Sequence, residues 1–169
     1  QFGDFNTLRI FDAANNIQKA SIKLVDTFGA TICWQDAATA SAVMPEAEAV
    51  TIAGLNANGT DTKQKTIAVA NAKVGCDPSG GVIALDANAP DGNRRVDVID
   101  LRDGSVVGSW QGKAPPSELR HVAIGGKGER LLISDATDAV ILHRLGRSWQ
   151  TDVAWKWPQR PRQLLARFD

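Results

Sequence analysis

Several residue types are scarce in this chain. Tyrosine is absent, methionine occurs once, and cysteine and histidine occur twice each. No run approaches the roughly 20 apolar residues of a membrane-spanning helix, so we expect a soluble protein without a membrane span. The 19 basic and 19 acidic residues cancel, which excludes a whole-chain field that would attract nucleic acid or an anionic membrane. Gln1 replaces an initiator methionine and no basic-then-apolar leader follows, as expected of a processed or trimmed start.

Motifs of assembled catalytic centres are missing as well. The sequence contains no Gly-x-Ser-x-Gly elbow and no His-Glu-x-x-His pair. The glycine-rich stretch Gly125–Gly128 lacks the Gly-Lys-Ser/Thr ending of a phosphate-binding loop and instead predicts a hairpin turn. His121 and His143 confine histidine-dependent catalysis to two positions. Because His143 alternates with Ile141 and Leu145 along one strand face, the pattern favours an imidazole packed in the core.

The two cysteines, Cys33 and Cys76, allow a single disulfide. They are 43 residues apart, and closing a loop of that length stabilises a protein by about 3–4 kcal/mol in the chain-entropy model. A buried free thiol is the alternative for Cys33, which lies in the apolar run Ala30–Trp34. A disulfide would favour an extracytoplasmic location. We expect no metal at the cysteines, because they have no nearby histidine partners.

What the chain has in quantity is β-forming sequence. Valine, isoleucine and threonine recur in short runs between turn formers, and 15 residues are glycine. Asp103-Gly104 is a strong hairpin signal. The composition predicts an all-β fold and a single β-rich domain over residues 1–169. The clearest predicted strands cover residues 82–85, 95–101, 105–110, 121–124, 130–134 and 139–145.

The first third of the chain is less regular. Phe5–Asp12 reads as a strand, and Ala20–Asp26 followed by Ala30–Trp34 predicts a hairpin. The segment Gln35–Ala49 is alanine-rich, and Pro45 would end a helix in it. We expect this segment to form either a helix or an extended loop. Further strands are predicted at residues 50–55 and 66–70, and a turn or loop at residues 76–81.

The order of elements in the second half is distinctive. An Asp-Gly turn leads to a strand ending in Trp110, a Pro-Pro link, a strand entering Gly-Lys-Gly, and a strand ending in Ser134-Asp135. Over about residues 66–145 this order resembles a β-propeller blade of the YVTN or WD40 type. The segments Thr66–Asn71, Val96–Asp100 and Val106–Trp110 carry the YVTN-like pattern.

This resemblance implies a propeller-like array of antiparallel hairpins, with blades of about 40–45 residues, that works as an interaction scaffold. The Trp-Asp dipeptide is absent, and 169 residues hold at most about four blades. A small propeller and a piece of a larger one are both compatible with that length. A β-sandwich or barrel is the alternative fold.

One loop contains oxygen-bearing side chains in a pattern similar to a calcium loop. Asp86, Asn88 and Asp91 are the candidate ligands, because alternating carboxylates and amides suit a hard cation. The calcium-loop pattern requires its third carboxylate at position 90, but this chain has Pro90 there. Asp91 is one residue beyond the required position. A solvated turn is therefore the favoured interpretation. No cofactor other than calcium is expected.

The C-terminal segment combines aromatic and basic residues. From Arg144 to Asp169 it has six basic and two acidic residues. Trp155 and Trp157 share one face at strand spacing, so residues 146–169 are expected to dock as a terminal strand or tail that seals a sheet edge. The candidate partner-binding residues are Trp149, Trp155, Trp157, Arg160 and Arg162.

These observations favour a non-enzymatic protein-interaction or scaffold domain that binds another protein or subunit through loops and one edge. One competing hypothesis is a hydrolase-like or lactonase-like enzyme subunit that uses loop carboxylates and a histidine. The other is a single-strand nucleic-acid binder that uses the tryptophans and arginines of the tail, which the balanced charge disfavours.

Overall fold

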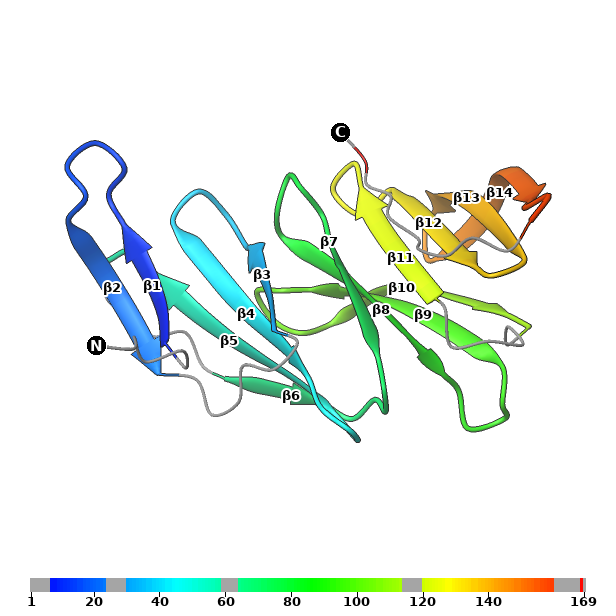
Figure 1. The fold of residues 1–169 in the computed structure, drawn as a ribbon, viewed down its shortest axis with the longest axis horizontal. Helices are drawn as coiled ribbons and strands as arrows, with labels where there is room; N and C mark the ends of the chain where they lie inside the picture. Colours follow the sequence, from blue (N-terminus) through cyan, green and yellow to red (C-terminus); the bar gives the residue numbers. More distant parts are fainter. Residues whose placement is uncertain (1–6, 24–29, 59–63, 114–119, 160–167, 169) are drawn as a thin grey trace.

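The computed structural model describes residues 7–23, 30–58, 64–113, 120–159 and 168. All regular elements in these residues are strands, which form three four-stranded antiparallel sheets and one two-stranded hairpin. The sheets follow one another along the molecule in chain order (Figure 1). Within the described ranges, no helix is long and apolar enough to cross a membrane.

The N-terminal hairpin consists of β1 (Thr7–Phe11) and β2 (Gln18–Lys23). Sheet I contains β3 (Thr31–Trp34), β4 (Thr39–Pro45), β5 (Val50–Asn56) and β6 (Lys65–Ile67). Sheet II contains β7 (Lys73–Cys76), β8 (Val82–Asn88), β9 (Arg94–Asp100) and β10 (Val106–Gly112). Sheet III contains β11 (Arg120–Gly125), β12 (Arg130–Asp135), β13 (Asp138–Leu145) and β14 (Ser148–Lys156).

Each four-stranded sheet is a meander in which every strand pairs with the next one in the chain. The first strands lie together, because β7 contacts both β3 and β11, and the fourth strands β10 and β14 also contact each other. The sheets therefore pack face to face and radiate from their first strands (Figure 1). We call the two packed interfaces junction I/II and junction II/III.

Side-chain alternation explains how sheet II packs on both neighbours. Ile83 and Leu85 of β8 belong to the apolar cluster of junction I/II, whereas Ala84, which lies between them, belongs to that of junction II/III. Ile83 and Ala84 are fully buried. A strand covered on both faces needs apolar residues at successive positions, which accounts for the continuous apolar run in β8.

Tight turns close the predicted hairpins. In the β9–β10 turn, Gly104 adopts φ of +73° and the Asp103 carboxylate accepts a hydrogen bond from the Ser105 amide at 2.8 Å. In the β11–β12 turn, Lys127 and its two flanking glycines all adopt positive φ. The glycine-rich segment is a hairpin turn, as predicted, because its backbone needs the left-handed region.

The structure confirms the predicted strands between Val82 and Leu145 and corrects the prediction for the first third. The segment expected to be a helix or a loop contains β4, whose residues are buried from Thr39 to Met44. The predicted hairpin of Ala20–Asp26 with Ala30–Trp34 is also wrong, because β2 pairs with β1 and β3 pairs with β4. The short strand β7 was not predicted at all.

Alanines make β4 suitable for this position. Ala42 and Met44 face the N-terminal hairpin and pack with its Leu8 and Ile22. The alternate residue Val43 faces junction I/II. Because small side chains let a second layer approach closely, an alanine-rich strand fits between two packed layers, and tertiary packing overrides its weak β propensity.

Candidate functional site: an aromatic face on sheet III

Junction II/III contains a buried ion-pair network. Arg94 at the start of β9 is 2% exposed and donates to both carboxylate oxygens of Asp86, at 2.9 and 2.5 Å. Its Nη1 lies 3.6 Å from the Asp135 carboxylate of sheet III, and its Nη2 donates to the Ser134 carbonyl oxygen at 3.2 Å. One guanidinium group thus ties two sheets together, and its fork geometry suits this bidentate role.

Arg120 completes the network at the start of β11. Its Nη1 donates to the Asn88 side-chain oxygen at 2.8 Å and lies 4.0 Å from Asp86. The two arginines and the two aspartates, Asp86 and Asp135, balance in charge. A buried network of this kind is tolerated when its members neutralise one another.

These contacts bear on the proposed calcium loop. Asp86 and Asn88 direct their oxygens to guanidinium groups, and Asp91 accepts hydrogen bonds from Asn93 in the exposed β8–β9 turn. A cation at this loop would have to displace Arg94 from Asp86. In the part of the chain that the structure describes, no three or more His, Cys, Asp or Glu side chains are grouped to hold a metal. The calcium site stays a prediction that these contacts disfavour.

At the opposite end of junction II/III, a side-chain carboxylate of sheet II binds the backbone of sheet III. The buried Asp77 carboxylate accepts hydrogen bonds from the amide of Ser79 and from that of Gly128 in the next sheet, both at 2.8 Å. Gly75 of β7 lies so close to β11 that an added Cβ would be 2.6 Å from the Val122 carbonyl oxygen. Only glycine permits this approach of the two first strands.

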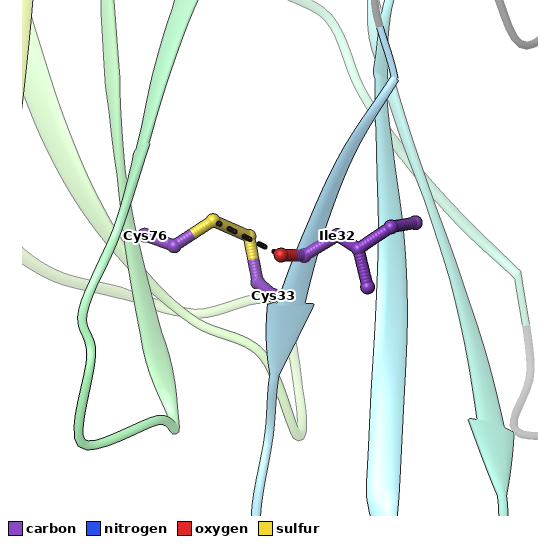
Figure 2. Close-up of a disulfide and its surroundings, with 3 residues drawn as sticks. All are labelled: Ile32, Cys33 and Cys76. Atoms are coloured by element: carbon purple, nitrogen blue, oxygen red, sulfur yellow. Dashed lines mark hydrogen bonds between the residues drawn. A yellow bond between two sulfur atoms is a disulfide. The ribbon is translucent and has the colours of Figure 1, made fainter. Parts of the chain in front are cut away.

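Junction I/II is joined covalently instead. Cys33 of β3 and Cys76 of β7 form a disulfide between adjacent first strands (Figure 2). Cys33 is 1% exposed and lies in the apolar cluster of this junction. Nearby, the Gly81 amide donates to the Trp34 carbonyl oxygen at 3.0 Å.

The face of sheet III that points away from sheet II gathers the aromatic residues of the C-terminal segment. Trp155 and Trp157 make an edge-to-face contact with ring centroids 5.7 Å apart. The Trp157 indole donates to the Asp135 carbonyl oxygen at 2.9 Å. Phe168 packs in the same cluster, and an added Cβ on Gly125 would be 2.5 Å from the Phe168 Cβ. We call this surface the aromatic face; its other members are Ala123, Leu132, Ala139 and Ile141.

The aromatic face continues outward along β13 and β14. Val153 pairs with Ile141 and alternates with Trp155, which places it on the same face. It is 52% exposed. His143 lies further along this face, partly exposed, where its Nδ1 contacts the Asp152 carboxylate. The expectation of an imidazole packed in the core is therefore wrong for His143, because this face has no second sheet over it among the described residues.

Of the other predicted binding residues, the described part of the chain contains only Trp149, which lies away from this surface. Trp149 points into junction II/III, where it packs against the apolar cluster beside Gly108, and its buried indole nitrogen has no hydrogen-bond partner among the described residues. Its ring fills the outer rim of that junction. Arg160 and Arg162 lie outside the described residues.

The β9–β10 turn is the most strongly charged part of junction I/II. Arg102 donates to both Asp100 carboxylate oxygens, and this hydrogen bonding lowers the pKa of Asp100. Hydrogen bonds from Ser105 lower the pKa of Asp103, with smaller contributions from the positive charges of Lys65 and Arg102. Both carboxylates are therefore held in their ionised form by donors of the turn.

Sequence patterns did not reveal the residues that join the sheets. Arg94 and Asp86 lie on neighbouring strands, with Arg94 opposite Asn88 and Asp86 opposite Val96. The one available signal was a charged residue within an otherwise apolar strand, which is rare unless the charge is paired. The sequence around Gly75 did not indicate its role, because that role depends on its contact with β11, which is distant in the chain.

Four-stranded antiparallel meanders that radiate from their first strands define a β-propeller architecture. The described residues form three four-stranded blades, sheets I to III, and a further two-stranded hairpin. The fold is of the WD40 propeller type. It superposes on the WD40 domain of Toxoplasma gondii coronin with a TM-score of 0.60 and 12% identity, over 91% of this chain and 41% of that chain.

Two further propellers show the same likeness. The Cps50 (Swd1) β-propeller domain of Myceliophteria thermophila gives a TM-score of 0.54 with 8% identity, over 90% of this chain and 54% of that chain. The WD40 domain of SCAP from fission yeast gives 0.50 with 9% identity, over 91% and 38%. The chain thus spans about half the length of these propellers or less. No protein-family model and no curated protein sequence matches it.

Proposed function

We propose that this chain is a non-enzymatic interaction scaffold that binds another protein through the aromatic face of sheet III. The observation that carries the proposal is the gathering of Trp155, Trp157 and Phe168 on a base of aliphatic residues, on the face turned away from the other sheets. Tryptophan and other large aromatic side chains dominate protein-protein binding energy. The WD40 propeller fold supports an interaction role by analogy only.

Exposed apolar residues at the margin of this face support the same function. Val153 on β14 is half exposed beside the cluster, and β14 is the outermost strand of sheet III. In sheet I, Ile32 and Trp34 of β3 are 49% and 50% exposed. Large apolar side chains in contiguous surface patches mark protein contact sites. We assign the aromatic face as the primary site because three aromatic rings converge there.

A random-peptide display library panned on the immobilised chain tests this proposal. We expect enriched peptides to lose most of their binding to the Val153→Asp variant, because a carboxylate on the aromatic face would have to be desolvated by the bound peptide. The matched control is Ile17→Asp, which places the same charge on a 55% exposed residue of the N-terminal hairpin. Peptides that bind both variants equally, or a library that gives no enrichment, would contradict the proposal.

A further inference from the structure

A hollow of about 230 Å³ with both polar and apolar lining opens in junction I/II, away from the aromatic face. Sheet I contributes Ser41, Gly54 and Lys65 to its wall, and the β9–β10 region of sheet II contributes Leu101 and Arg102. The remaining lining residues are Gln35 and Ile52. A water molecule occupies about 30 Å³ in the liquid, so a single structural water does not fill this space.

The hollow exists because two residues of sheet I are small. Ser41 pairs with Gly54 across β4 and β5. At the corresponding place in sheet II, Ala84 pairs with Val98, and both side chains are buried in the apolar cluster of junction II/III. The Ser-Gly pair replaces this apolar filling with a hydroxyl group and an open space.

Ser41 brings an unsatisfied polar group to this wall. The side chain is 1% exposed, and its Oγ has no hydrogen-bond partner among the described residues. Leaving a buried hydroxyl unpaired is costly, and such groups in native structures are expected to meet a water or a ligand. A polar ligand in the hollow would supply the missing partner.

The mouth of the hollow is rich in hydrogen-bond donors. The Lys65 ammonium group donates to the neutral Arg102 carbonyl oxygen, and no carboxylate lies within ion-pair distance of it in the described residues. Arg102 uses its Nε and Nη2 on Asp100, which leaves Nη1 without an acceptor among the described residues. The nearby Asp103 carboxylate already accepts from the Ser105 amide. The free donors call for a ligand that carries acceptor oxygens and negative charge.

We propose that this hollow binds a carboxylate group on a short apolar stem. Lys65 and Arg102 hold the carboxylate at the mouth, Ile52 and Leu101 contact the stem, and Ser41 hydrogen-bonds a polar atom at the inner end. The same chemistry is offered by a free small dicarboxylic acid and by a glutamate side chain of a polypeptide. The site does not depend on the function proposed for the aromatic face.

Amide chemical-shift titration of the full ¹⁵N-labelled chain tests this site. The probes are glutarate for the free acid, N-acetylglutamate N-methylamide for the peptide side chain, and N-acetylglutamine N-methylamide as the neutral analogue. We expect saturable shifts at the amides of Ser41, Gly54 and Arg102 with at least one acid, and none with the neutral analogue. Whichever acid binds more tightly identifies the source of the carboxylate.

Variants of the lining residues sharpen the test. Ser41→Ala should weaken binding about fivefold and Lys65→Gln about tenfold or more, as expected for losing one neutral and one charged hydrogen bond. Gly54→Val, which introduces the residue found at the matching position of sheet II, should abolish binding by filling the hollow. Gly54 lies in regular strand backbone without positive φ, so valine is compatible with its conformation.

The matched control is Lys23→Gln, which removes an exposed lysine from β2 and should leave binding unchanged. No saturable shift with either acid up to about 10 mM, a range that covers affinities of about 3 kcal/mol and stronger, would overturn the proposal. Equal shifts with the neutral analogue, or binding that Gly54→Val leaves intact, would overturn it as well.

Discussion

Junction I/II and junction II/III join similar sheets by different chemistry. In junction I/II, the first strands β3 and β7 are linked by a disulfide, and the interface has an apolar cluster beside the hollow at Ser41 and the charged β9–β10 turn. In junction II/III, β7 and β11 touch directly at Gly75, and at one end the buried Arg94, paired with Asp86 of its own sheet, reaches Asp135 of sheet III. One junction is thus held covalently, and the other by close packing and matched charges.

The difference shows that the blade fold does not prescribe how neighbouring sheets are held together. A disulfide acts mainly on the unfolded chain by restricting its conformations. A buried ion pair acts in the folded state and depends on both partners being present, because a single buried charge is strongly unfavourable. The two junctions should therefore fail under different perturbations.

The largest expected effect is at junction II/III. Asp86→Ala leaves Arg94 buried without its bidentate partner, and we expect the free energy of unfolding to fall by about 3–5 kcal/mol. Urea unfolding at pH 7 measures the loss, and amide hydrogen exchange should place it in β8, β9 and β11.

Asp91→Ala is the matched control for this change, since Asp91 is exposed and bonds only within its own turn. Its effect should stay within about 0.5 kcal/mol. If both variants lose the same stability, pairing with Arg94 is not what makes Asp86 important.

At junction I/II, removing the disulfide with Cys33→Ala and Cys76→Ala together should lower the free energy of unfolding by about 3–4 kcal/mol, mainly through the less restricted unfolded chain. Reducing the wild-type protein before urea unfolding should give a similar loss. The double variant should not respond to reductant. A loss that hydrogen exchange places in β11 instead of β3 and β7 would contradict the separation of the two junctions.

The smallest expected effect concerns acid at the β9–β10 turn. The pKa of Asp100 lies below its ordinary value of 3.8 because Arg102 hydrogen-bonds the carboxylate. This contribution is complete above that ordinary value and is lost as the pH falls through the lowered folded-state pKa. Arg102→Gln should therefore make the loss of stability below about pH 4 slightly smaller, since an exposed arginine contributes little to stability.

Urea midpoints measured between about pH 2 and pH 6 check this expectation. Arg147→Gln, in the exposed β13–β14 turn, removes an arginine that has no ion-pair partner among the described residues and should leave the pH profile unchanged. A profile unaltered by Arg102→Gln would show that the Asp100 pair does not contribute to stability.

Local sequence signals predicted the second half of the fold well. Strands from Val82 to Leu145 are separated by turns whose glycine and aspartate residues specify hairpins, so neighbours in sequence pair in space. The first third was harder, because β2 and β3 resemble hairpin partners and only tertiary packing assigns them to different sheets. Alanine-rich β4 has no strong preference of its own.

The candidate site was predictable only in part. Trp155 and Trp157 share a face because they are two residues apart in an extended segment, and this spacing is visible in the sequence. Phe168 and Gly125 meet only through folding, and so do Ser41 and Arg102 at the hollow. Alternation cannot tell which face of a strand meets a neighbouring sheet, so the inward direction of Trp149 was not foreseeable.

The disulfide between Cys33 and Cys76 also has a mechanical consequence. A chain pulled from its two ends cannot extend the segment between these cysteines while the bond is intact. The bond spans 43 residues, which would otherwise contribute about 150 Å to the stretched length. Strand pairing in sheet I can break under tension. The segment between the two cysteines, which contains most of sheet I and β7, stays looped and carries no load. Force then runs through the covalent bridge to the rest of sheet II and on to sheet III.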